Sequence, residues 1–106
     1  MEIDREHKAP QLTVSFQKIG QNSDGELSFA VIMARFDGKW IFVRHRERST
    51  LEIPGGRREI GETITKTAER EFHEETGAQD FTIVPHCEYT VLSPDGKQTR
   101  GLLCYA

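Results

Sequence analysis

Residues 56–78 read GRREIGETITKTAEREFHEETGA and contain the one clear helical pattern of the chain. Apolar side chains recur in it at four-residue spacing: Ile64, Ala68 and Phe72. This spacing places them on one face of a helix. Gly77 is a natural stop, because glycine adopts the left-handed conformation of a helix C-terminus without strain. The pattern predicts an amphipathic helix over residues 63–76.

Three glutamates lie close together near the end of this stretch. Glu71, Glu74 and Glu75 stand at positions i, i+3 and i+4, so all three project from one helix face. Their charges repel one another, and a divalent cation would remove that penalty. Carboxylate ligands suit Mg²⁺, Mn²⁺ or Ca²⁺ and not zinc. The alternative is a solvated acidic surface, which is what most charge runs are.

The residues beside these glutamates fit the metal hypothesis. Arg70 can reach Glu74 one turn on, and it can also orient Glu71. The Pro54-Gly55-Gly56 turn lets the backbone approach a metal or a substrate closely, because glycine has no Cβ. The carbonyl of Gly55 is a candidate extra ligand.

The complete spacing resembles the Nudix box, whose form is Gly-x5-Glu-x7-Arg-Glu-U-x-Glu-Glu-x-Gly-U with U a bulky aliphatic residue. Every polar and glycine position of that form is matched between Gly56 and Gly77. The two U positions carry Phe72 and Ala78, a departure that affects packing and not chemistry. The lead-in over residues 51–56 also resembles the family.

The resemblance implies a fold and an activity. The fold is the Nudix α/β/α sandwich, with a mixed sheet between helices and the box as a loop–helix–loop, here in a single domain over residues 1–106. The activity is hydrolysis of a nucleoside diphosphate linked to another group, with Mg²⁺ as cofactor and Mn²⁺ as the alternative. It implies metal ligation by four residues: Glu71, Glu74, Glu75 and Gly55 through its carbonyl. The catalytic set adds Arg70, which holds Glu71, and Glu62, which supports the metal cluster or its waters.

Substrate contacts are expected from Gly55, Gly56 and Arg46. An arginine at the place of Arg46 often contacts substrate phosphate in MutT-like members, and a guanidinium binds two phosphate oxygens at once. The alternative interpretation of Arg46 is that it belongs to a solvent-exposed loop and contributes only to solubility. Trp40 is expected in the sheet core rather than as a platform for base stacking. Residues 40–59 resemble a bacterial MutT-like subgroup that acts on oxidised or ordinary nucleoside triphosphates and sometimes on RNA 5′ ends, although nothing else here indicates RNA.

The rest of the chain predicts strands around one helix, an α+β domain with a mixed sheet. Residues 21–25 are a polar turn cluster, residues 54–56 a break, and Asp37-Gly38 a hairpin turn. The expected strands are 12–17, 27–36, 40–44, 81–84, 88–92 and 99–105.

Composition excludes several classes of protein. The chain has 106 residues and a formal net charge of −3, which fits one small domain and demands neither nucleic acid nor a membrane as partner. The longest apolar run, residues 29–34, is too short to span a bilayer, and residues 1–8 lack the apolar core of a signal peptide. A cytoplasmic location is therefore expected. Cys87 and Cys104 are expected to be reduced core thiols.

The chain ends at Ala106 inside an expected strand. Nudix proteins usually continue through further strands and a second long helix, so these C-terminal elements are expected to be missing. That part often supplies another carboxylate, for which Glu88 is a candidate substitute that no geometric reason favours. Unpaired strand edges favour self-association as a homodimer.

Two functions stay open. The first is an active hydrolase, which the intact box favours. The second is a non-catalytic nucleotide-binding or regulatory Nudix domain, or an inactive fragment.

Overall fold

The computed structural model describes residues 12–44 and 50–106, which form nine strands, one α-helix and one 3₁₀ turn. The N-terminal elements are β1 (Thr13–Gln17), the 3₁₀ turn (Asp24–Glu26), β2 (Phe29–Met33), β3 (Arg35–Phe36), β4 (Lys39–Trp40) and β5 (Val43–Arg44). They are followed by β6 (Leu51–Glu52), β7 (Gly55–Arg57), α1 (Ile64–Thr76), β8 (Val84–Leu92) and β9 (Gln98–Tyr105).

Five of the strands form the main sheet in the order β1-β8-β9-β2-β7. β2 and β9 are parallel, and the other neighbours are antiparallel, so the sheet is mixed as predicted. Two smaller ladders, β3–β4 and β5–β6, lie outside it. β7 is an edge strand, and it brings the glycines of the box lead-in beside β2.

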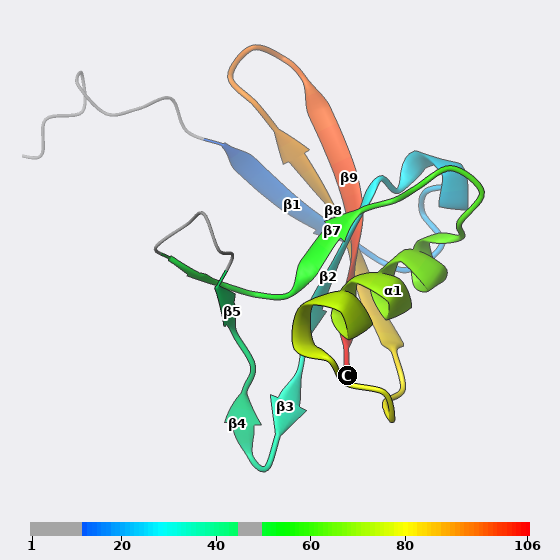
Figure 1. The fold of residues 1–106 in the computed structure, drawn as a ribbon. Coiled ribbons are helices and arrows are strands. Elements are labelled where there is room, and N and C mark those ends of the chain that lie inside the picture. The colour runs from blue at the N-terminus through cyan, green and yellow to red at the C-terminus, as the bar shows by residue number, and fades with distance from the viewer. Residues whose placement is uncertain (1–11, 45–49) are drawn as a thin grey trace, which may run out of the picture.

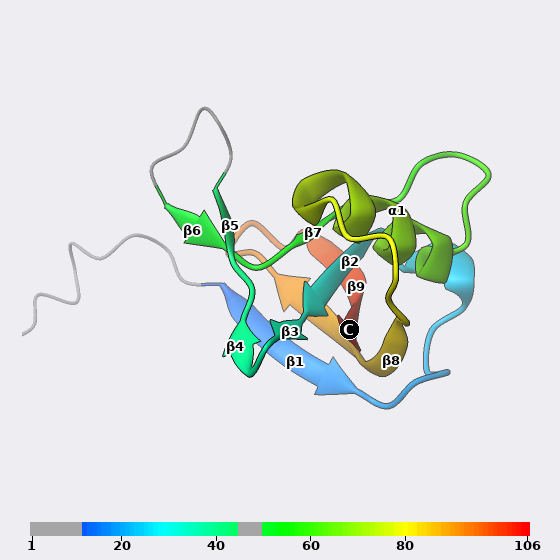
Figure 2. The same cartoon turned by 60° about the horizontal axis from the view of Figure 1, so that its bottom comes forward.

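Helix α1 lies across one face of this sheet (Figures 1 and 2). Its N-cap is Thr63, whose side chain accepts a hydrogen bond from the backbone of Lys66, and it ends at Gly77 with φ of 76°. The prediction of a helix over 63–76 is therefore confirmed. The buried core beneath it joins the helix to β2 and β9, and consists of Leu27, Ala30, Ile32, Ala34, Ile64, Ala68, Phe72, Leu102 and Cys104.

The Asp37-Gly38 turn is confirmed as a hairpin. Both residues have positive φ, 54° and 77°, as a two-residue type I′ turn requires. It joins β3 to β4, in which Arg35 pairs with Trp40. The hairpin extends beyond the end of β2, away from the main sheet (Figure 1).

The glycine-rich break expected at residues 54–56 is wrong in part. Gly55 and Gly56 begin β7 and pair with β2. A Cβ on Gly55 would lie 2.4 Å from the carbonyl oxygen of Ala30. Glycine is present because the two backbones approach each other closely, and not because the chain turns away from the sheet.

Three strand predictions and one core prediction also need correction. The expected strand 27–36 is interrupted at Ala34, and the expected strand 40–44 is interrupted at Ile41 and Phe42. The expected strands 81–84 and 88–92 are one strand, β8, which begins at Val84 and contains a register shift between Pro85 and Cys87. Trp40 is not a core residue, because 47% of it is exposed. Both residues of β4 are exposed, because this strand belongs to the projecting hairpin and not to the main sheet.

Both cysteines are free thiols, Cys104 buried and Cys87 half-buried, which confirms the prediction for them. Burial raises the pKa of Cys104 to about 12, so this thiol is unreactive at neutral pH. In the described part of the chain, no helix has the length and apolar character needed to cross a bilayer.

Candidate active site

Arg70, in the middle of α1, joins the acidic side chains of the box. Its guanidinium donates through Nε and Nη2 to the two carboxylate oxygens of Glu62. Nη1 donates to Glu71 at 2.7 Å and to Glu74 at 3.2 Å. Nη2 also donates to the carbonyl of Arg57 on β7 at 3.0 Å. One planar side chain thus connects the helix to β7, which we call the glycine strand. The guanidinium suits this role because its N–H donors point in several fixed directions.

Glu62 is held as firmly as Arg70. Besides the guanidinium, its carboxylate accepts hydrogen bonds from the backbone of Glu59 and from the hydroxyl of Thr67, both at 2.9 Å. The hydrogen bond from Arg70 and the bond from the Glu59 backbone lower the pKa of Glu62 to about 2. Glu62 therefore stays ionised at neutral pH, and it acts on the other glutamates through Arg70.

Thr67 is a positioning residue that the sequence analysis missed. It is fully buried, and its hydroxyl also bonds to the carbonyl of Thr63. The sequence hints at this role only through the position of Thr67, four residues after the helix N-cap. A threonine there is usually explained by its hydrogen bond to the backbone carbonyl four residues earlier, without any role for Glu62.

Glu71 packs directly against the glycine strand. A Cβ on Gly56 would lie 2.0 Å from its Oε2. Desolvation by burial raises the pKa of Glu71, and the nearby charges of Glu75 and Glu74 act in the same direction, against the hydrogen bond from Arg70. The carboxylate is thus partly desolvated and lies beside two like charges, and Arg70 only partly offsets these effects.

Glu75 also contacts the glycine strand. It accepts a hydrogen bond from the backbone N–H of Gly55 at 2.8 Å. The N–H and C=O of one strand residue point to the same side, so the Gly55 carbonyl is turned away from β2. The Arg57 carbonyl, two residues on, points to that side as well, since it accepts from Arg70. The Gly55 carbonyl therefore faces the side of β7 on which α1 lies, as a ligand role requires.

Glu74 is the most open of the three glutamates, with 56% of its side chain exposed against 16% for Glu71. Its hydrogen bond with Arg70 is the longer of the two that Nη1 donates. It can therefore turn toward a ligand in solution at little cost, because the ion pair it would give up is exposed.

The donor set fits a hard divalent cation. Carboxylates from one helix turn face a strand with a carbonyl turned toward them, and Glu71 lies where any side chain on Gly56 would collide with it. Within residues 12–44 and 50–106, no three acidic, histidine or cysteine side chains already converge on one point. The carboxylates are held instead by Arg70 and the Gly55 N–H, and rotation of their side-chain torsions would be needed to gather them.

The prediction for Arg46 stays untested, and the one for Glu88 needs correction. Arg46 falls outside the described residues. Glu88 is 2% exposed and does not contact the box: it accepts hydrogen bonds from the backbones of Gly20 and Asn22 and from the Asn22 amide, at 2.8 to 2.9 Å. The idea that Glu88 replaces a catalytic carboxylate is therefore wrong, because its oxygens are committed to the loop after β1.

The box geometry has a counterpart in known proteins. The family model described as the NUDIX domain matches residues 25–106. The chain belongs to the Nudix family. A Nudix relative of solved structure, the Bacillus subtilis pyrophosphohydrolase BsRppH in a mutant form, superimposes with a TM-score of 0.78 at 30% identity, over 91% of this chain and 60% of its own. The predicted Nudix fold class is thus confirmed.

Two curated relatives match a shorter part of the chain. The protein named "Putative 8-oxo-dGTP diphosphatase YtkD" of Bacillus subtilis is 38% identical over 64 residues, which are 60% of this chain and 40% of the relative. The "Probable DHNTP pyrophosphohydrolase" of Lactococcus lactis is 41% identical over 56 residues, or 53% of this chain and 33% of the relative. The matches therefore span less than half of either curated relative.

Proposed function

We propose that this Nudix chain hydrolyses a phosphoanhydride bond in a nucleoside di- or triphosphate derivative, with Mg²⁺ as cofactor and Mn²⁺ as the alternative ion. One observation carries the proposal. Glu71 and Glu75 project from adjacent turns of α1 onto Gly56 and Gly55, while Glu74 stays open to solvent beside them. Clustered carboxylates together with a carbonyl turned toward them are the ligands that hard cations prefer.

In this proposal Glu71, Glu74, Glu75 and the Gly55 carbonyl hold the ion. When bound, Mg²⁺ supplies charge neutralisation of the diphosphate and lowers the pKa of an attacking water. Gly56 keeps the strand free of side chains where substrate and Glu71 meet. Further residues have positioning roles: Arg70 orients Glu71 and Glu74, and Glu62 and Thr67 orient Arg70.

The substrate class is argued from the relatives and from charge. The three relatives are named as a diphosphatase and two pyrophosphohydrolases, so the shared chemistry is cleavage within a phosphate chain. A MutT-like nucleoside triphosphate pyrophosphohydrolase, acting on ordinary or oxidised nucleotides, is the specific form proposed. Arg46 remains a proposed phosphate contact.

The compartment and assembly are part of the same proposal. A cytoplasmic location is supported by the two free thiols, since reducing conditions keep such thiols unpaired. Association as a homodimer is supported by the sheet edges β1 and β7, because edge strands offer unpaired backbone groups.

The test is release of phosphate or pyrophosphate from a nucleotide panel in the presence of Mg²⁺, with Glu74→Gln as the matched variant. The panel holds dGTP, 8-oxo-dGTP, ADP-ribose and a dinucleoside polyphosphate. We expect release that requires Mg²⁺ and is lost in the variant. Nucleotide binding by a folded chain without any release would instead favour a non-catalytic Nudix domain.

A further inference from the structure

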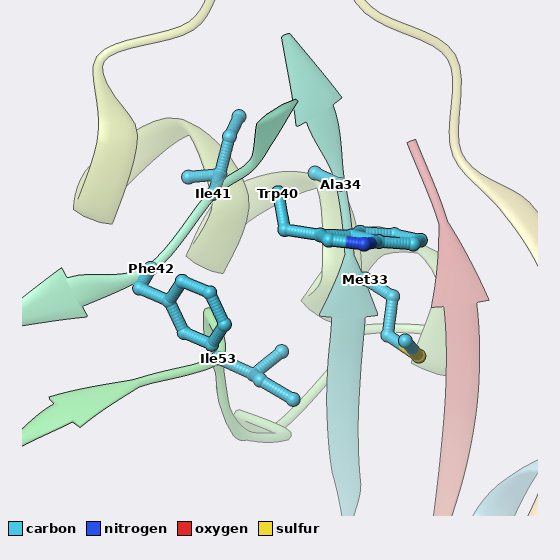
Figure 3. A pocket seen from close by; sticks show the side chains of 6 residues that line it. All are labelled: Met33, Ala34, Trp40, Ile41, Phe42 and Ile53. Atoms are coloured by element: carbon cyan, nitrogen blue, oxygen red, sulfur yellow. The ribbon is translucent and has the colours of Figure 1, made fainter. Parts of the chain in front are cut away.

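A cleft beside the box is lined only by apolar side chains. Its volume is about 260 Å³ (Figure 3). The lining residues, which we call the aromatic cleft, are Met33, Ala34, Trp40, Ile41, Phe42 and Ile53. Trp40 and Phe42 are 47% and 52% exposed, so their rings border open space and do not fill a core. Figure 3 shows the indole edge-on, with Phe42 and Ile53 across the opening from it.

The aromatic cleft is continuous with the box. A second hollow of about 560 Å³ shares Ile41 and Phe42 with it and extends to Arg44 and Glu75. Ile53 also stands two residues before Gly55, whose N–H donates to Glu75. A molecule placed with one end at the box glutamates can therefore extend its other end along these two hollows into the aromatic cleft.

The ring of Trp40 is held in place before any ligand binds. It sits next to the type I′ turn and pairs across the hairpin with Arg35, whose guanidinium lies 4.9 Å over the indole. A guanidinium over an aromatic face is attractive, and it restricts the rotation of both side chains. A ring fixed in this way loses little conformational freedom on binding a flat partner.

We propose that the aromatic cleft binds the planar base of the nucleotide whose phosphates lie at the box. The inference rests on the proposed function, since the box supplies the anchor for the phosphates. The cleft is smaller than the pockets that enclose whole drug-sized ligands, which begin at about 300 Å³, and this suits one ring system. Stacking on Trp40 and apolar contact with Phe42 and Ile53 provide the attraction.

The lining has a consequence for specificity. None of its six side chains has a strong hydrogen-bonding group apart from the indole N–H of Trp40. An apolar pocket rejects a close analogue that adds one polar group by only about 100-fold. The chain is therefore expected to separate purines from pyrimidines by stacking area, and to separate dGTP from 8-oxo-dGTP by no more than about 100-fold.

Trp40 is the only tryptophan of the chain, so its fluorescence reports on this site directly. The experiment titrates the Glu74→Gln variant, in which hydrolysis is suppressed, with dGTP, with guanosine and with inorganic tripolyphosphate. We expect the emission of Trp40 to change with dGTP and with guanosine, and to stay constant with tripolyphosphate. An equal change with tripolyphosphate, or no change with either base-containing ligand, would overturn the proposal.

Kinetics of substituted chains give the second measurement. Trp40→Ala should raise KM about 10-fold with kcat unchanged, because stacking binds substrate and transition state alike. Trp40→Phe should restore part of the loss, and Phe16→Ala, an exposed aromatic on β1, is the matched control with unchanged KM. A KM within twofold of the wild type in Trp40→Ala would also overturn the assignment. Fluorescence binding without hydrolysis in the wild type would contradict the proposed function alone.

Discussion

The box and the aromatic cleft are neighbours that are built in opposite ways. In the box, formed by β7 and α1, polar side chains are fixed by hydrogen bonds: Arg70 alone bonds to three glutamates and a carbonyl. In the cleft, large apolar side chains are exposed and only the Trp40 ring has a directed partner, Arg35. We therefore place the proposed metal chemistry in the first region and the proposed recognition of a flat base in the second.

This difference explains why the two regions respond differently to sequence change. Displacing one carboxylate in the box alters the geometry of the reacting groups, which affects kcat. Trimming a ring in the cleft removes contact area that is the same before and during the reaction, which affects KM.

The largest effect is expected from Gly56→Ala. The new Cβ would lie 2.0 Å from Oε2 of Glu71, so the carboxylate must move, and a shift of about 1 Å at a reacting centre can cost about 100-fold in rate. Thermal unfolding should change less than in Gly55→Ala, because the atoms displaced belong to the Glu71 side chain and not to the backbone. Activity and melting temperature of the same preparation check both statements.

Gly55→Ala is the matched control for that change. Its Cβ would collide with the backbone carbonyl of Ala30 at 2.4 Å, so this variant should lose stability as well as activity. If Gly56→Ala kept full kcat, the packing of Glu71 against β7 would have no functional role.

The next effect is expected from Arg70→Lys, which keeps the charge and removes the planar fork. A lysine cannot bond to both oxygens of Glu62 and also reach Glu71 and Glu74. We expect kcat to fall about 10- to 100-fold, as for other residues that orient metal ligands, with KM nearly unchanged. Arg57→Lys is the control, since that guanidinium lies over the Phe29 ring. An Arg70→Lys chain with wild-type kcat would show that Arg70 does not orient the glutamates.

A smaller effect, on stability alone, is expected from Glu88→Gln. Desolvation raises the pKa of Glu88, but the hydrogen bonds from Gly20 and Asn22 outweigh it and lower the pKa below the ordinary value of 4.5. Loss of these charge-assisted bonds should reduce the free energy of unfolding at pH 7 by about 1–3 kcal/mol. Urea denaturation measures this, with the exposed Glu69→Gln as control.

The same pair of chains tests the pH dependence. A lowered carboxylate pKa contributes stability that is present above pH 4.5 and is lost as pH falls through the folded-state value. The difference in stability between the wild type and Glu88→Gln should therefore shrink as the pH falls below 4.5. A constant difference would mean that the charge of Glu88 is not what holds the loop.

The box region could be predicted from the sequence because its information is local. The spacing of Glu71, Glu74 and Glu75 determines their shared face, and the caps of α1 at Thr63 and Gly77 determine its ends. The Asp37-Gly38 turn was predictable for the same reason, since both residues tolerate positive φ.

What could not be predicted depends on partners distant in sequence. Gly55 is a strand residue because its backbone meets Ala30, 25 positions earlier, and no local pattern of glycines indicates that contact. Glu88 is buried because the loop at Gly20 and Asn22 supplies three donors, more than 60 positions away. Trp40 is exposed because its hairpin projects from the sheet, which its own strand pattern cannot reveal.

The central claim is that three glutamates of one helix bind a divalent cation against the glycine strand. Mn²⁺ binding tests it most directly. Binding is monitored through the electron paramagnetic resonance signal of the free ion, which decreases as the ion is bound. The wild type, Glu71→Gln, Glu74→Gln and Glu75→Gln would each be titrated. The account predicts binding by the wild type and affinities at least about 10-fold weaker in the three variants. Equal binding by all four chains, or no binding by the folded wild type, would contradict it.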